Sequence, residues 1–261
     1  MLHYRELPPA AEISHLAFLF FELASEPMGK PFAHELFPDG TVSLIYHRNS
    51  LLGIEQLLSA GLRATLAKVP VRPGDIFWGM RVAPAAAALL VGGNPRGLPA
   101  NSLGFPSALE PLGQKMMSGF KKCENLEDAV SVFSAGLKDL GVSAGDIDDK
   151  VAAAVEMIET SGGIVKISEI ATALSLSTRQ FQRRFAAATG SSPKQYARIR
   201  RFYRTATVLA SREKVNWAER AAAMGFADQA HLSRELSALT GRSPHSFARR
   251  VRAITHGKLV K

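Results

Sequence analysis

The hydrophobic positions follow different patterns in the two parts of the chain. Residues 1–110 contain short apolar or alternating runs broken by Gly, Pro and Asn, at Thr41–His47, Leu62–Val69, Asp75–Val82 and Ala86–Val91. Runs of this length between turn residues are typical of β-strands, so we expect a small antiparallel β-barrel or sandwich. The alanine-rich stretch Ala83–Leu90 fits the start of a helix equally well.

A helix is expected at about Asn125–Leu140, between the two parts. Its apolar residues recur at intervals of four, three, four and three: Leu126, Val130, Phe133, Leu137 and Leu140. Such a narrow seam packs either on its own domain or against the same helix of a second subunit. The spacing alone does not choose between these. Gly141–Gly145 is the expected joint between domains.

One sequence pattern occurs twice in the last hundred residues. Ser177–Pro193 (STRQFQRRFAAATGSSP) and Asp228–Pro244 (DQAHLSRELSALTGRSP) share the ending Thr-Gly-x-Ser-Pro at an offset of 51 residues. Each is preceded by a shorter apolar-periodic segment, at Ser168–Leu174 and at Trp217–Met224. A short helix, a tight turn and a second helix with one basic face form a helix-turn-helix, and two in tandem indicate DNA binding.

The second helix of the first copy separates its faces clearly. Phe181 and Phe185 are four residues apart and fall on one side. The outward positions carry Arg179, Gln182 and Arg183, and Arg and Gln pair bidentately with guanine and adenine edges. We therefore expect these three side chains to contact bases. Ser177 is the expected N-cap, and Gly190 the expected left-handed end of the helix. A preceding helix is expected from Asp146 to about Glu159.

The corresponding helix of the second copy is expected to begin after the N-cap Asp228. Its outward positions carry Gln229, Ala230, Ser233 and Arg234, with His231 nearby. Ala230 stands where the first copy has Arg179, and alanine reads only a thymine methyl. The second copy is therefore expected to discriminate less between bases. Gly225, in its turn, is expected to take a positive φ.

The distribution of charge agrees with this division. The net charge is +9, but from Lys150 onward there are 20 Lys and Arg against 7 Asp and Glu, whereas residues 1–149 hold 12 against 16. A basic segment that coincides with the repeat is typical of a nucleic-acid-binding domain. The single cysteine, Cys123, excludes an intramolecular disulfide and a Cys-rich zinc cluster.

Residues from about Lys150 to Ala253 resemble the DNA-binding domain of the AraC/XylS family of transcriptional regulators. The resemblance rests on the whole repeat, with Leu232 and Leu236 standing where the family usually has Phe. It implies base contacts by the outward residues of both copies, a rigid linking helix that starts near Lys194, and Lys194 itself as a DNA contact. It also implies a promoter DNA partner, RNA polymerase, a possible small-molecule effector and a homodimer formed through helices like that of Asn125–Leu140.

The first part of the chain more loosely resembles the cupin-like sensing domains that precede AraC-type domains, through LFPDGTVSLIYH and GMRVAPAAAALLVG. Cupins often bind a metal through histidines, but His3, His15, His34 and His47 form no His-x-His pair or facial triad. We expect no metal, no cofactor and no enzymatic activity. Two alternatives remain: a cupin-type metal enzyme with a DNA-binding appendage, and an alkylation-repair regulator with a methyl-accepting cysteine.

The sequence therefore predicts an α+β protein with two domains. Residues 1–141 would form a β-rich sensing domain with a dimerisation-type helix, and residues 146–255 an all-α tandem helix-turn-helix domain. The predicted function is sequence-specific transcription regulation, more often activation in this family. The N-terminus lacks a signal peptide pattern and the apolar runs are too short to cross a bilayer, so a cytoplasmic location without membrane contact is expected.

Overall fold

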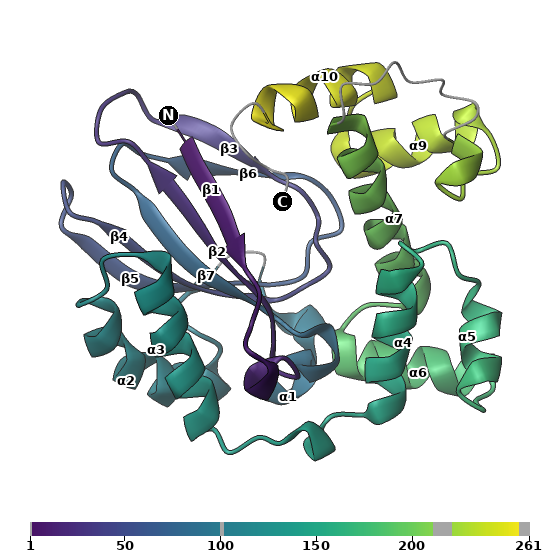
Figure 1. The fold of residues 1–261 in the computed structure, drawn as a ribbon, viewed down its shortest axis with the longest axis horizontal. Coiled ribbons are helices and arrows are strands. Elements are labelled where there is room, and N and C mark those ends of the chain that lie inside the picture. Colours follow the sequence, from purple (N-terminus) through teal and green to yellow (C-terminus); the bar gives the residue numbers. More distant parts are fainter. Residues whose placement is uncertain (1, 100–101, 211–220, 256–261) are drawn as a thin grey trace.

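The computed structural model describes residues 2–99, 102–210 and 221–255 of the chain (Figure 1). The N-terminal part, residues 2–140, contains two antiparallel β-sheets with helices at their edge and on one face. In the C-terminal part, from Asp149 onward, the regular elements of the described residues are all helices. The predicted α+β class is thus confirmed.

The larger sheet has six strands in the order β1-β2-β7-β4-β5-β8, and each neighbouring pair is antiparallel. In that order the strands are β1 (Leu2–Leu7), β2 (Ala17–Ser25), β7 (Ile76–Val82), β4 (Ser43–Asn49), β5 (Ile54–Ala60) and β8 (Ser102–Leu103). The smaller sheet pairs β3 (Phe32–Leu36) with β6 (Ala67–Val71).

Two of the four predicted strands match observed ones and two do not. Thr41–His47 and Asp75–Val82 overlap β4 and β7. The prediction at Leu62–Val69 is wrong over most of its length, because β5 ends at Ala60 and β6 begins at Ala67. Ala86–Val91 is helical, with a 3-10 turn at Pro84–Ala86 and helix α1 at Ala87–Val91. Proline at the first helical position and the alanines that follow favour a helix there.

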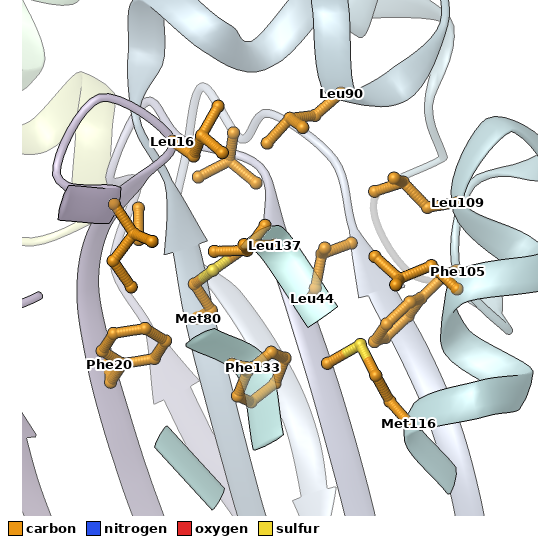
Figure 2. Close-up of a cluster of buried hydrophobic side chains, with 14 of the residues drawn as sticks. Leu16, Phe20, Leu44, Met80, Leu90, Phe105, Leu109, Met116, Phe133 and Leu137 are labelled. Carbon is orange, nitrogen blue, oxygen red and sulfur yellow. The ribbon is translucent and has the colours of Figure 1, made fainter. Parts of the chain in front are cut away.

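The main core lies between the larger sheet and helices α2 (Glu110–Phe120) and α3 (Leu126–Asp139), as Figure 2 shows. The ring of Phe133 on α3 lies 5.8 Å from that of Phe20 on β2, centre to centre. Leu126, Phe133 and Leu137 are each at most 2% exposed. These residues of the α3 seam therefore pack on the sheet of their own domain, which is the first of the two arrangements that the spacing allowed.

The C-terminal part contains two helical cores joined by one long helix. Its helices are α4 (Asp149–Thr160), α5 (Ile167–Ala173), α6 (Thr178–Thr189), α7 (Pro193–Ala210), α9 (Gln229–Thr240) and α10 (Pro244–Thr255). The first core contains Phe181, Phe185 and Tyr196; the second contains Phe202, Leu236 and Phe247. Helix α7 contributes Tyr196 to the first and Phe202 to the second, so it belongs to both.

Some predicted boundaries need correction or cannot be compared. Helix α4 begins three residues later than expected, because Asp148 and not Asp146 accepts the N-terminal backbone hydrogen bonds. Half of the support helix predicted at Trp217–Met224, residues 217–220, lies outside the described residues, as does the tail from His256; residues 221–223 are helical. Within the described residues, none of the helices has the length and apolarity needed to cross a membrane.

Candidate DNA-binding interface

Helix α6 is held at both ends by local signals in its own sequence. The Ser177 hydroxyl accepts a hydrogen bond of 3.2 Å from the Gln180 backbone N–H, and the Gln180 side chain accepts one of 3.0 Å from the Ser177 N–H. This reciprocal capping box satisfies two N–H groups that the helix itself leaves unpaired. Gly190 ends the helix with a φ of +72°. The predicted N-cap and end of this helix are both confirmed.

The burial of α6 fixes which of its faces is outward. Phe181 and Phe185 are at most 1% exposed, and their rings meet edge to face at 5.7 Å. On the other face Arg179, Gln182 and Arg183 are all exposed. The three residues predicted to contact bases therefore share the solvent-facing side of one helix.

A fourth residue of α6 was missed by sequence reasoning. Arg184 donates hydrogen bonds of 2.8 and 2.9 Å to the two carboxylate oxygens of Asp148, the N-cap of α4. Arg184 thus fixes α6 against α4 and is not available for DNA in the way that Arg183 is. The sequence gives no signal that distinguishes an arginine that contacts bases from a neighbouring arginine that forms an ion pair within the protein.

Helix α9 repeats the construction of α6. The Asp228 side chain accepts a hydrogen bond from the His231 backbone N–H, 2.6 Å long, and Gly241 ends the helix with a φ of +69°. Leu232, Leu236 and Leu239 are at most 2% exposed. Gln229 and Arg234 are exposed, and so is Ala230.

Two of the predicted contacts on α9 are occupied within the protein. The His231 ring accepts a hydrogen bond of 3.2 Å from the Ala227 backbone N–H through Nδ1 and lies edge-on to Phe226. The Ser233 hydroxyl donates to the Gln229 carbonyl oxygen at 2.9 Å. Both side chains are half-buried. The outward face of α9 therefore offers Gln229 and Arg234 as its long polar groups.

The turns of the two motifs use the same backbone conformation with different residues. Gly225 has the predicted positive φ, +77°, and the equivalent Ser175 has a φ of +51°. A positive φ is costly for residues with a side chain, so the first motif holds its turn under strain that the second avoids.

The arginines of α7 form hydrogen bonds and ion pairs with neighbouring helices and loops. Arg198 bonds Glu235 on α9 at 2.5 Å, and Arg200 pairs with Glu159 on α4 at 2.7 Å. Arg201 donates to the carbonyl oxygens of Gly163 in the first copy and Gly225 in the second. Burial lowers the pKa of Arg201. Lys194, at the start of α7, is exposed, as a DNA contact requires.

A cavity of about 210 Å³ lies where the N-terminal part meets the end of α6 and the start of α7. Leu62, Arg63 and Arg96 line it from the N-terminal part, Ser192 from the turn before α7 and Gln195 from α7 itself. It is smaller than the roughly 300–1,000 Å³ that is usual for ligand sites.

Comparison with known proteins identifies the repeat. Residues 170–250 match the sequence model of a family described as a helix-turn-helix domain. The match includes helices α6, α7 and α9, so the C-terminal part contains a helix-turn-helix domain. A helix-turn-helix domain is a DNA-binding element, so the matched part of the chain is a DNA-binding module. No curated protein sequence matches the chain.

Among solved structures, the chain is similar to ToxT from Vibrio cholerae. An apo form of a ToxT variant from strain SCE256 is 10% identical, with a TM-score of 0.44, over 94% of this chain and 100% of that one. Wild-type ToxT bound to an unsaturated fatty acid is 9% identical, with a TM-score of 0.42, over 95% of this chain and 94% of that one.

Proposed function

We propose that this protein activates transcription by reading two consecutive major-groove segments of promoter DNA with α6 and α9. The observation that carries the proposal is the equivalent construction of these helices, each capped at one end, ended by a glycine and exposing long polar side chains. Helices of this kind present their N-terminal turns to base edges.

Within this proposal the base contacts come from Arg179, Gln182 and Arg183 on α6 and from Gln229 and Arg234 on α9. Their exposure and side-chain chemistry support this assignment. Ser233 and His231 would act on the second segment mainly by shaping the start of α9, since their hydroxyl and ring are bonded locally. Lys194 would contact a phosphate, a contact that positions the protein without specifying sequence.

The division of labour proposed is a sensing domain at residues 1–141 and a DNA-binding domain at 146–255. A small effector acting on the first, RNA polymerase as the partner of the bound protein and a cytoplasmic location belong to the same proposal. The cavity at the seam between the two parts is a candidate effector site that would take only a small molecule. The homodimer implied by the resemblance stays part of the same proposal, although Leu126, Phe133 and Leu137 of α3 are buried within the N-terminal part itself.

Neither alternative function has an observation in its favour. Cys123 is 3% exposed, and burial raises the pKa of its thiol, whereas a methyl-accepting cysteine needs an accessible thiolate. Among the described residues there is no group of three or more His, Cys, Asp or Glu side chains that could hold a metal ion.

The deciding experiment is selection of binding sites from randomised duplexes by the full-length protein at two salt concentrations, with Arg183→Ala and Arg234→Ala alongside. We expect a defined site with two segments, and a loss of about 1–3 kcal/mol of base discrimination in each variant, each at its own segment. Binding that is steeply salt-dependent and has no sequence preference would contradict the proposal.

A further inference from the structure

The N-terminal part of the chain contacts both copies of the repeat at the same turn. In the first copy, the Arg96 side chain donates a hydrogen bond of 2.6 Å to the carbonyl oxygen of Gly190. In the second, the Leu66 backbone N–H donates one of 2.9 Å to the carbonyl oxygen of Leu239, and Arg242 pairs with Glu35. Gly190 is equivalent to Gly241, so both contacts fall within two residues of the shared Thr-Gly-x-Ser-Pro turn.

The first copy is held by the segment Pro84–Gly97, which includes α1 and packs along α6 and α4. The approach is close at Gly190. A Cβ added there would lie 2.7 Å from a methyl group of Leu62 and 2.8 Å from the Cβ of Pro95. Because Gly190 also has a positive φ, this position requires glycine for two independent reasons.

The second copy is held by one end of the small sheet β3–β6. Glu35, on β3, is 7% exposed and pairs with Arg242. Leu66 directly precedes β6, and Phe37 directly follows β3. The ring of Phe37 lies 5.6 Å from that of Phe247, edge to face, and 5.7 Å from that of Phe202. The N-terminal part therefore supplies an aromatic side chain to the core of the second copy.

These two contacts come from different elements of one framework. The Pro84–Gly97 segment follows β7 in the chain, and Ala86, Ala87 and Leu90 belong to the core of the larger sheet. The small sheet is joined to the larger one through the connections β3–β4 and β6–β7. In Figure 1 the two elements lie at opposite ends of the N-terminal part, beside α6 and beside α10.

We infer that the N-terminal part sets the separation and orientation of the two reading helices on DNA, by holding each at the turn that follows it. This inference rests on the proposed function. The linking helix α7 then does not fix the spacing alone, although it spans roughly 27 Å at 1.5 Å per residue. Releasing the Glu35–Arg242 pair and the Phe37 contact frees the second copy, while the first stays in place. A signal that moves the small sheet would thereby change which half-site spacing the protein accepts.

The test uses the full-length protein with Glu35→Gln and Phe37→Ala combined, and Glu55→Gln as the control. Glu55 is an exposed residue of the same part that pairs with Lys121, away from the repeat. The first measurement is backbone hydrogen exchange without DNA. Faster exchange in residues 221–240 of the double variant, with residues 178–190 unchanged, is expected. Unchanged exchange in both regions would show that the contact does not hold the second copy and would overturn the inference.

The second measurement is affinity for duplexes that carry the selected site with one to four base pairs inserted between its segments. The wild type and Glu55→Gln should prefer one spacing. In the double variant, the ratio of affinities for the preferred and the other spacings should fall about tenfold. A preference unchanged in the double variant would assign the spacing to α7 alone. If the double variant fails to fold, the milder Arg242→Lys takes its place. If wild-type protein selects no site, the proposed function fails, and hydrogen exchange still decides whether the contact exists.

Discussion

Arg184 on the first reading helix and Asp148 at the start of α4 form a two-point hydrogen-bonded ion pair, with distances of 2.8 and 2.9 Å. The same carboxylate accepts the backbone N–H groups of Lys150 and Val151. Burial by itself would raise the pKa of Asp148, but the hydrogen bonds from Arg184 and Val151 bring the pKa below its usual value. One side chain thus caps α4 and orients α6.

Asp148→Ala should lower DNA affinity without changing the preferred sequence, because α6 loses its orientation but keeps its reading side chains. Loss of the cap should destabilise the first copy by about 1 kcal/mol.

A carboxyl group with a lowered folded-state pKa stabilises the fold above its unfolded pKa of about 4, and this contribution disappears as the pH falls through the folded value. The difference in melting temperature from wild type should therefore be constant from neutral pH down to about pH 5 and shrink below about pH 4.

Asp149→Ala is the matched control for this prediction, since Asp149 lies in the same helical turn but its carboxylate accepts a hydrogen bond from the Lys150 backbone N–H instead of from Arg184. An equal loss of DNA affinity in both variants would show that the Arg184 contact has no special role.

The neighbouring arginines of α6 should behave differently on replacement. Arg183→Ala should remove about 1–3 kcal/mol of discrimination at one base pair, because an exposed guanidinium is free to pair with a guanine edge. Arg184→Ala should weaken binding to all sequences equally. Lys194→Ala should also weaken binding uniformly and reduce the salt slope by about one. Affinity for single-base variants of the selected site, at several salt concentrations, distinguishes these three patterns.

Asp75 is a buried carboxylate that accepts hydrogen bonds from three donors at the end of the larger sheet. It accepts hydrogen bonds from the Asn49 amide at 2.7 Å, the Arg72 backbone N–H at 2.7 Å and the His47 ring at 3.0 Å. Burial by itself raises the pKa of Asp75, but these hydrogen bonds bring the pKa below its usual value. Asp75→Ala leaves the donors unsatisfied and should destabilise the fold by about 3 kcal/mol or more. Urea denaturation followed by circular dichroism measures this, and a cost below 1 kcal/mol would contradict the network's role.

The positive φ at Gly225 predicts an asymmetric result when the two motif turns are exchanged. Gly225→Ser should destabilise the second copy by about 1–2 kcal/mol. A serine there would have to keep the left-handed backbone conformation, and its Cβ would lie 2.8 Å from the Ile164 side chain. The reverse change, Ser175→Gly, relieves the strain at a φ of +51° and should not destabilise the first copy. Thermal melting of both variants provides the comparison. Similar losses in both would mean that φ is not what distinguishes the turns.

Sequence reasoning succeeded where the signal is local. Ser177 and Asp228 cap helices, and Gly190 and Gly225 take positive φ, because each acts on backbone groups within a few residues. Strand β2 was not predicted, because Ala17–Ser25 is almost continuously apolar and its buried residues do not alternate with exposed ones. Helix α1 was ambiguous for the same reason, since a short run of apolar residues has no period to detect.

The contacts between distant segments were not predictable from the chain. Nothing local to Arg184 indicates Asp148, and nothing local to Phe37 indicates the core around Phe247. The arginines of α7 are a further example, because nothing local to Arg198, Arg200 or Arg201 indicates the groups on other segments to which they are bonded. Such pairings depend on how helices pack, which a single sequence does not encode in any short window.

The second reading helix should contribute less sequence discrimination than the first. The alanine at position 230 faces solvent where Arg179 stands in α6, and the Ser233 hydroxyl is bonded to the Gln229 carbonyl oxygen. Only Gln229 and Arg234 remain as long polar side chains on that outward face. Exchanging base pairs under each motif in turn should therefore cost more affinity at the α6 segment than at the α9 segment, and Ala230→Arg should add a preference at one base pair of about 1–3 kcal/mol. Equal costs at the two segments in the wild-type protein would mean that α9 reads its segment through groups other than these.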